Sequence, residues 1–276
     1  MADALRLSAH ELQRAWAARV RANRAQVDAF REVTSTDFYA PVARLFRAHP
    51  HVEEDAALGR LRALVRADEV VLDIGAGGGR LTLGLAGAVR EVVAIEPSAG
   101  MLEVLRTGIA ENAVGNVRVV EGRWPELAAE VSGDVALIAH LGYDVEDIGS
   151  FLDAMERAAR RLCVAVLLER PPPTEADRLW PAIHGVERAA LPALPEFLAL
   201  LLARGRVFEV QLVERAQQAY TDPEQPLIWL RQQLWTRPGS EKDVRLQTLL
   251  QEQLEEREGR LALSWTPVRM GIVSWH

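Results

Sequence analysis

The chain is poor in cysteine and lysine and has no long apolar run. Its single cysteine among 276 residues, Cys163, excludes an internal disulfide. The single lysine, Lys242, does not complete a glycine-rich Gly-Lys-Ser/Thr segment, so a P-loop is absent. No apolar run reaches the roughly 18 residues that span a bilayer, and the N-terminus lacks the basic-then-apolar order of a signal peptide. We therefore expect a cytoplasmic protein with no membrane partner.

The chain also has fewer basic than acidic residues. Lysine and arginine together number 32 against 39 acidic residues, which gives a formal net charge of −7. A protein that holds nucleic acid by non-specific electrostatics carries a basic face, so a nucleic-acid partner is not favoured. The six histidines form no His-x-x-x-His pair with an acid partner, and no cysteine cluster exists, so no metal site is expected. The hydrophobic fraction of 49% and the charged fraction of 26% are those of an ordinary globular protein.

The most informative segment runs from Val70 to Leu81. An apolar run ends in Asp73, and glycines then stand at alternate positions before a helix-like pattern begins. A short apolar run closed by glycines predicts a buried parallel strand and a sharp turn. Glycine lets the backbone approach a ligand closely, and the amides that open the next helix face a bound polar or anionic group. The segment therefore predicts a nucleotide-binding loop between a strand and a helix.

The glycine spacing narrows the choice of nucleotide. A dinucleotide fold requires Gly-x-Gly-x-x-Gly, and the third glycine falls on Arg80 in one register and on Thr82 in the other. The segment instead reads Asp-x-Gly-x-Gly-x-Gly, which resembles the first motif of the class I S-adenosylmethionine-dependent methyltransferases. The resemblance implies S-adenosylmethionine as cofactor and S-adenosylhomocysteine as its product. It assigns cofactor contacts to the motif residues Asp73, Gly75, Ala76, Gly77 and Gly79.

A second acid follows at a suitable distance. Residues 91–96 form a strand-like run that ends in Glu96, 17 residues after Gly79, which leaves room for one helix. A carboxylate at the tip of the second strand is placed to accept hydrogen bonds from both ribose hydroxyls, as in dinucleotide folds. The next segment is similar to the family's: Ser98 opens a helix, and Pro97 and Met101 are expected to contact the adenosine part of the cofactor.

The ends of the third and fourth strands hold the remaining candidates. Family members often carry an aspartate just after the third strand, and here Arg123 takes that place. Glu121 or the amides of Arg123 and Trp124 are then alternative adenine partners, and Trp124 is suited to pack on the ring. After the fourth strand, His140 lies where the methyl group would meet the acceptor. It is either a general base or a residue that lines the cofactor pocket. The Asn/Asp-Pro-Pro-aromatic motif of amide and exocyclic-amine methyltransferases is absent.

Alternating strand and helix patterns predict the α/β class, with a doubly wound sheet of seven strands whose last strands are antiparallel. Strands are expected at residues 70–74, 91–96, 117–121, 134–139, 162–168, 207–213 and 261–275. Helices are expected at residues 80–88, 99–111, 125–130, 147–161 and 191–203. A helical insertion at about 214–260, with helices at 227–235 and 244–258, precedes the final strand.

Residues 1–66 predict a helical extension before a methyltransferase domain at 67–276. Ser8 and Glu11 have the spacing of a capping box, and helical patterns follow at 38–48 and 53–66. In the family that the motifs resemble, helices before the first strand often fold over the cofactor as a lid. Tyr39 has a hydroxyl suited to reach the methionine carboxylate or the acceptor. The alternative is that Tyr39 only caps a buried aromatic cluster.

Together these patterns predict an enzyme that transfers a methyl group from S-adenosylmethionine to a small-molecule acceptor by in-line displacement. His140 and Tyr39 are its candidate catalytic residues. Two alternatives stay open: an RNA methyltransferase with a weakly basic groove, and a non-catalytic methyltransferase-like module that binds partners through its added helices. Because the sulfonium is already a strong electrophile, alignment and exclusion of water are the expected mechanism. The sequence for that reason identifies the cofactor more sharply than the acceptor.

Overall fold

The computed structural model describes residues 8–48, 56–172, 174–215, 219–257, 259–263 and 268–276. The elements before the main sheet are the long helix α1 (Ala9–Phe30), the 3-10 helix η2 (Ala40–Phe46) and α2 (Ala56–Leu64). The capping box predicted at the start of α1 is confirmed. The Ser8 hydroxyl accepts the Glu11 amide at 3.2 Å, and the Glu11 carboxylate accepts the Ser8 amide at 2.7 Å. These reciprocal bonds satisfy amides that the first turn leaves free, and they fix where α1 begins.

Seven strands form the main sheet. They are β1 (Val70–Ile74), β2 (Glu91–Glu96), β3 (Val117–Glu121), β4 (Gly133–Ala139), β5 (Ala159–Leu168), β6 (Phe208–Glu214) and β10 (Arg269–Trp275). Their order is β3-β2-β1-β4-β5-β10-β6. Strands β1 to β5 pair in parallel, and β10 is antiparallel to both β5 and β6. The predicted fold class is confirmed, and the order reverses between β1 and β4, the switch point at which such sheets bind ligands.

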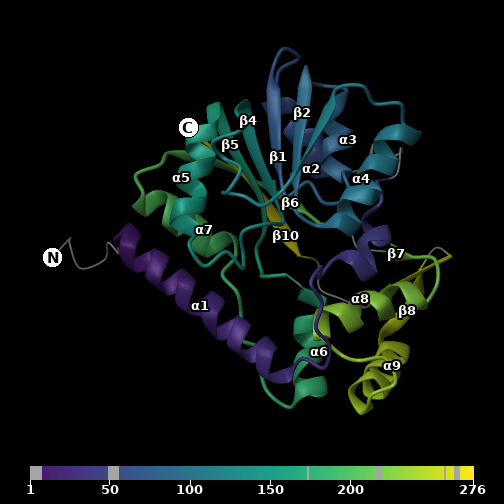
Figure 1. Ribbon diagram of the computed structural model, residues 1–276. Coiled ribbons are helices and arrows are strands. Elements are labelled where there is room, and N and C mark those ends of the chain that lie inside the picture. Colours follow the sequence, from purple (N-terminus) through teal and green to yellow (C-terminus); the bar gives the residue numbers. More distant parts are fainter. Residues whose placement is uncertain (1–7, 49–55, 173, 216–218, 258, 264–267) are drawn as a thin grey trace.

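Helices cover both faces of this sheet (Figure 1). On one face, α5 (Ile148–Ala158) and α7 (Leu194–Ala203) share a core with α1. On the other face, α2 and α3 (Arg80–Ala86) form a second core. Strand β1 contributes Leu72 and Ile74 to the first core and Val71 to the second. Because successive side chains of a strand point to opposite faces, a strand buried on both sides is apolar throughout, as residues 70–72 are.

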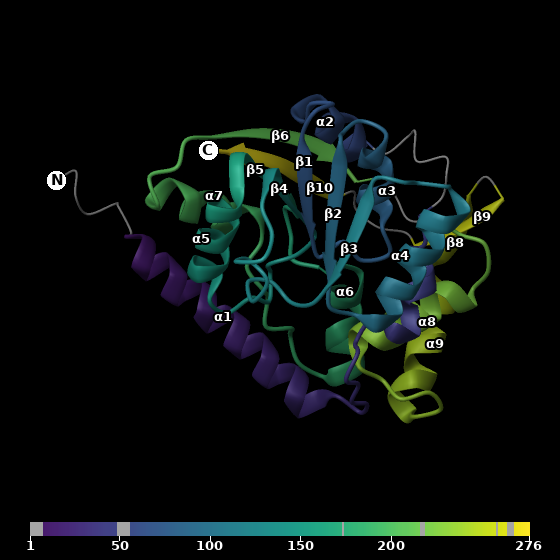
Figure 2. The same cartoon turned by 45° about the horizontal axis from the view of Figure 1, so that its top comes forward.

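A third core lies beside the main sheet, and we call its elements the cap. They are α6 (Thr174–His184), α8 (Glu224–Leu234), α9 (Glu241–Gln253) and a small sheet of β7 (Ala219–Tyr220), β8 (Leu254–Arg257) and β9 (Arg260–Leu263). Figures 1 and 2 show α6, α8 and α9 gathered on one side of the molecule, near the end of α1. Val27 and Phe30 of α1 pack against the leucines of this core, so the cap also holds the N-terminal extension.

Two features of helix placement differ from the predictions. Residues 125–130, predicted as a helix, form consecutive turns. Six residues give too few hydrogen bonds to offset the cost of helix nucleation. Helix α6 was not predicted, although its buried residues recur at helical spacing, because prolines at 171–173 obscure its start. Those buried residues are Ala176, Leu179, Trp180 and Ile183.

The insertion at about 214–260 and the final strand also need correction. Helix α9 ends at Gln253, whereas its pattern predicts a helix to 258; Leu254 instead pairs with Leu263 in the small sheet. The single strand predicted at 261–275 is two strands, β9 in the cap and β10 in the main sheet. Leu263 faces the cap core and Ile272 faces a core of the main sheet. Alternation alone does not reveal which sheet a strand joins, because the pairing partners are remote in sequence.

A buried ion pair anchors the start of β1, and it generates the first prediction. The Arg161 guanidinium donates to the carboxylate of Glu69, which is 5% exposed, and also to the Leu64 carbonyl at 2.9 Å. Arg161→Met removes a guanidinium whose side chain is 24% exposed and leaves the buried carboxylate with the Arg66 amide at 2.9 Å, so we expect a loss of about 1–3 kcal/mol in unfolding free energy. Urea unfolding measures the loss, and adding Glu69→Gln in the same chain should restore part of it. An Arg161→Met protein as stable as the wild type would contradict this role.

Candidate functional site

The glycine loop joins the end of β1 to the start of α3. Gly75, Gly77 and Gly79 have left-handed backbone angles, with φ of 74°, 55° and 88°, which residues with a β-carbon adopt only at a cost. The amides of Gly75 and Ala76 donate to the Ile95 carbonyl of β2 at 2.8 and 3.0 Å, so the loop folds onto the neighbouring strand. A β-carbon built at Gly77 would meet no other atom of the described residues within 4 Å. The loop thus leaves open space where a ligand approaching the backbone would lie.

Asp73 supports this loop from inside the fold. It is buried at 2% exposure, and its carboxylate accepts the hydroxyl of Thr82 in α3 at 2.5 Å. The bond ties the strand before the loop to the helix after it. Burial raises the pKa of Asp73 to about 6 against the opposing effect of the Thr82 hydrogen bond, and the negative charge of Glu96 adds to the rise. Thr82 was not predicted as a site residue.

The Glu96 carboxylate joins the glycine loop to the segment that follows β2. One carboxylate oxygen accepts the Gly77 amide at 2.9 Å, and the other accepts the Ser98 amide at 2.8 Å. The residue is only 5% exposed. Burial raises its pKa above the ordinary value, although both amide hydrogen bonds oppose the rise. The predicted ribose-binding acid is therefore held beside the glycine loop, at the end of β2.

Helix α4 (Ala99–Glu111) begins next to this carboxylate. Ser98 is its N-cap, and the Ser98 hydroxyl accepts the Met101 amide at 3.1 Å. Met101 is buried at 2% exposure, whereas Pro97 is exposed. The two predicted adenosine contacts thus differ in kind, because Met101 faces the interior and Pro97 faces the surface.

The two predicted residues after β3 lie in different environments. Arg123 is exposed, and its charge opposes the rise in the pKa of Glu96. Trp124 is buried in the core beneath α5, where its indole N–H donates to the Phe151 carbonyl at 3.3 Å. That environment favours a packing role for Trp124 over stacking on adenine.

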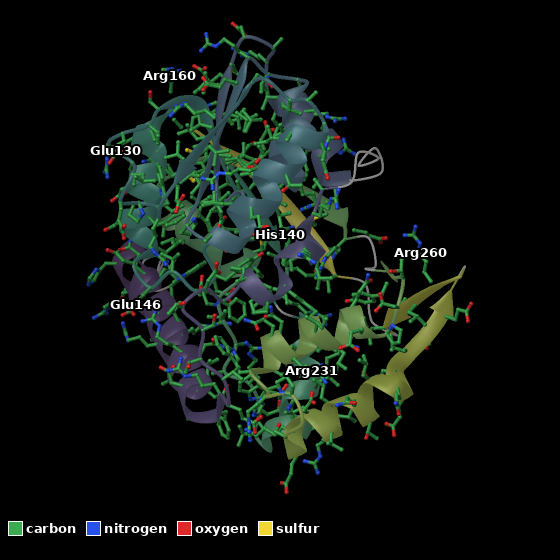
Figure 3. The ribbon with its side chains drawn as sticks, turned by 45° about the vertical axis from the view of Figure 1, so that its right-hand side comes forward. Glu130, His140, Glu146, Arg160, Arg231 and Arg260 are labelled. Atoms are coloured by element: carbon green, nitrogen blue, oxygen red, sulfur yellow. The ribbon has the colours of Figure 1, made fainter. Side chains whose placement is uncertain are left out.

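His140 follows β4 in a left-handed conformation, with φ of 54°. Its amide donates to the Val166 carbonyl of β5 at 2.8 Å, and its Nδ1 atom is buried without a hydrogen-bond partner among the described residues. Figure 3 shows His140 between the main sheet and the cap. Burial lowers its pKa to about 3, and the positive charges of Arg80 and Arg215 act in the same direction. The imidazole is therefore neutral at physiological pH and a weak proton acceptor.

Residues 37–46, which we call the strap, lie across the glycine loop and α4. A β-carbon at Gly100 would lie 2.8 Å from the Ala40 Cα, and one at Gly78 would collide with the Phe46 carbonyl oxygen. Both glycines therefore admit the backbone of the strap. The other end of this segment contacts the cap, where the Gln232 amide group donates to the Phe38 carbonyl and the Phe38 and Trp235 rings lie 4.9 Å apart.

Tyr39 lies on the strap, in ring contact with Phe38 and Phe46 at 5.1 and 5.9 Å. Burial of its hydroxyl raises the pKa of Tyr39 to about 12, and the negative charges of Asp144 and Glu96 add to the rise. Yet 41% of the residue remains accessible.

Two structural absences concern the described part of the chain. Within it, no helix combines the length and the apolar character needed to cross a membrane. Across the same residues, no three histidine, cysteine or acidic side chains gather as metal ligands would.

Comparison with known proteins agrees with this geometry. A family model described as a methyltransferase domain matches residues 71–161, from β1 into β5. This stretch is a methyltransferase domain. For residues 71–161 the match confirms the predicted family. It also confirms the prediction of an enzyme that uses S-adenosylmethionine as its cofactor.

Individual relatives are more distant. A probable cobalt-precorrin-6B C(15)-methyltransferase of Methanothermobacter thermautotrophicus is 30% identical over 105 residues, which cover 37% of this chain and 55% of the relative. The chain thus matches about half the length of that relative. YcgJ of Bacillus subtilis has a TM-score of 0.54 at 16% identity, over 80% of this chain and 98% of its own. A methyltransferase of Thiobacillus denitrificans, solved with S-adenosylhomocysteine, has a TM-score of 0.52 at 17% identity, over 88% and 99%. Both of these solved structures share the fold of this chain.

The raised pKa of Asp73 generates a prediction about stability and pH. Its folded-state pKa lies above the unfolded value, so ionising the carboxylate lowers the stability of the fold. This cost is absent below about pH 4, grows as the pH rises, and is complete above about pH 6. Asp73→Asn removes the charge and can still accept the Thr82 hydroxyl. We expect the variant to gain up to about 3 kcal/mol on the wild type as the pH rises from about 4 to about 8. Urea unfolding at both pH values checks this, and a constant stability difference would contradict it.

Proposed function

We propose that this chain transfers a methyl group from S-adenosylmethionine to a small-molecule acceptor. The observation that carries the proposal is the open space at Gly77 beside the buried carboxylate of Glu96, at the switch point of a methyltransferase domain. When bound, S-adenosylmethionine supplies a methyl group that its sulfonium already activates. The residues of the chain then need to hold the cofactor, align the acceptor and exclude water.

Glu96 is suited to hold the ribose. Each of its two oxygens accepts one backbone amide, from Gly77 and from Ser98. An ionised carboxylate has about four lone-pair positions, so two remain for hydroxyl donors. The two amides also fix the orientation of the carboxylate before a ligand arrives, which lowers the entropic cost of binding. The glycine loop residues Gly75, Ala76, Gly77 and Gly79 would then border the cofactor through their backbone, with Asp73 and Thr82 as the support beneath.

For His140 we favour a role in lining the cofactor pocket over one as general base. A base whose conjugate acid has a pKa of about 3 removes a proton poorly at neutral pH. The buried Nδ1 atom offers one hydrogen-bonding position to a ligand. Tyr39 complements it, because a phenol with a pKa of about 12 stays protonated and donates a hydrogen bond. We therefore assign Tyr39 the contact with the methionine carboxylate or the acceptor.

The acceptor is best sought among small molecules. The strap lies against the glycine loop and contacts the cap, which supports an acceptor that fits a partly enclosed space, and the net charge of −7 disfavours a long nucleic acid. The name of the archaeal relative makes tetrapyrrole carboxylates one class to include. The test is to measure cofactor binding by calorimetry, and then the release of S-adenosylhomocysteine with tetrapyrroles, phenols, thiols, amines and transfer RNA. Absence of cofactor binding would overturn the proposal. Release with RNA alone would favour an RNA methyltransferase, and binding without release from any acceptor would favour a non-catalytic module.

The open space at Gly77 gives a prediction for binding. Asparagine tolerates the left-handed angle better than other residues with a side chain, so Gly77→Asn should fold and fill the space meant for the ligand. We expect affinity for S-adenosylhomocysteine to fall at least about tenfold, by calorimetry, as a clash costs on the order of 1–3 kcal/mol. Gly205→Asn is the matched control, since Gly205 also has a left-handed angle and open surroundings but precedes β6, away from the site. Equal affinity in the two variants would contradict the assignment.

Glu96 gives a second prediction for binding. Glu96→Ala removes two charge-assisted hydrogen bonds to the ribose, each typically contributing about 1.5–3 kcal/mol, so affinity should fall at least about tenfold. Glu91→Ala is the control, because Glu91 begins the same strand at its far end and pairs with Arg118 at the surface. A folded Glu96→Ala protein that binds S-adenosylhomocysteine as the wild type does would show that this acid is only structural.

A further inference from the structure

Asp37, which was not predicted as a site residue, fastens the strap to the cofactor domain. The Ser98 hydroxyl is 2.9 Å from each of its carboxylate oxygens, and the Gly100 amide donates to it at 3.1 Å. Ser98 is the N-cap of α4 and Gly100 lies in its first turn, where free amides and the helix dipole favour a negative charge. The Tyr39 amide also donates to the carboxylate, at 3.1 Å. One side chain thus joins the start of α4 to the backbone of Tyr39.

The same contacts connect Asp37 to the glycine loop. Ser98 donates its backbone amide to Glu96 and its side-chain hydroxyl to Asp37. Glu96 in turn accepts the Gly77 amide. A continuous set of hydrogen bonds therefore runs from the glycine loop through Glu96 and Ser98 to the strap.

Asp37 remains ionised under physiological conditions. Burial would raise its pKa, but the hydrogen bonds from Gly100, Ser98 and Tyr39 outweigh burial and lower it. A charged acceptor that receives several donors makes stronger hydrogen bonds than a neutral one.

We propose that Asp37 is a positioning residue for the cofactor: by holding the strap on α4 it sets Tyr39 over Glu96 and closes the site around bound S-adenosylmethionine. The inference rests on the proposed function and assigns to this site a residue outside the glycine motif. The strap is also attached to the cap through Phe38, and Arg47, the residue after the strap, pairs with Glu111 at the end of α4 at 2.6 Å. Asp37 differs from them because its donors adjoin the predicted ribose-binding acid.

Asp37→Asn tests the proposal with little change in shape. The amide nitrogen of asparagine would face a donor, either the Ser98 hydroxyl or a backbone amide, so the fastening weakens. We expect the dissociation constant for S-adenosylhomocysteine to rise about tenfold, mainly through faster release, and KM for S-adenosylmethionine to rise more than kcat falls. Trypsin should also cut faster after Arg44 of the strap, and excess S-adenosylhomocysteine should slow that cut in the wild type.

Glu32→Gln is the matched control. Glu32 belongs to the same N-terminal segment and accepts the Arg237 amide and the Ser240 hydroxyl at 2.8 and 2.7 Å, but these donors belong to the cap. We expect Glu32→Gln to lose about as much thermal stability as Asp37→Asn does and to keep its affinity for S-adenosylhomocysteine. If Asp37→Asn does not fold, Ser98→Ala removes one of the same hydrogen bonds and serves as the second variant.

The outcomes separate the two proposals. Weaker binding and faster cutting in Asp37→Asn alone support the positioning role. Unchanged binding and cutting overturn it, and so does an equal loss of affinity in Glu32→Gln, because the effect would then be general loosening. A wild-type chain that binds no S-adenosylhomocysteine overturns the proposed function itself, and that result appears before any variant is compared.

Discussion

The carboxylate of Glu96 is the interaction on which the site depends. It accepts the Gly77 amide from the loop after β1 and the Ser98 amide from the segment after β2. Both segments leave parallel strands at the same edge of the sheet, so neither has a regular partner there for its amide. A neutral side chain in this place would leave amide donors buried without strong acceptors. One acid therefore holds the glycine loop and the segment that leads into α4 together.

The arrangement around this edge explains why the chain is larger than its methyltransferase domain. The cap has its own core, and the N-terminal extension reaches both the cap, through Phe30, and α4, through the strap. The extension thus contacts both the cap and the methyltransferase domain. Because the strap touches Gly78 and Gly100 through backbone atoms, a side chain at either glycine would displace it. Such close approaches explain glycines that the cofactor motif alone does not require.

The sequence reveals the parts of this site that are local. The Asp73 motif, the strand that ends in Glu96 and the helix that begins after Ser98 are each defined within a few residues, and each element lies where its pattern predicts. Asp37 and Thr82 gave no such signal. The role of Asp37 depends on donors 61 and 63 residues away, which no spacing rule anticipates. The strands β8 and β9 were predicted wrongly for a related reason: residues 254–257 continue a helical pattern and residues 260–263 continue the alternation of the final strand, but both pair in a cap sheet that only the tertiary structure defines.

The predicted titrating residues of the site all have pKa values shifted toward the neutral form, unlike Asp37, whose pKa is lowered. Burial shifts His140 and Tyr39 toward their neutral forms, with pKa values of about 3 and about 12, and raises the pKa of Asp73 and Glu96. Neither predicted catalytic residue therefore exchanges protons readily near neutral pH. Acid–base catalysis works best with a pKa close to the working pH. A site with these groups is better suited to a reaction whose electrophile is already activated, in which the protein contributes alignment, a fixed polar environment and exclusion of water.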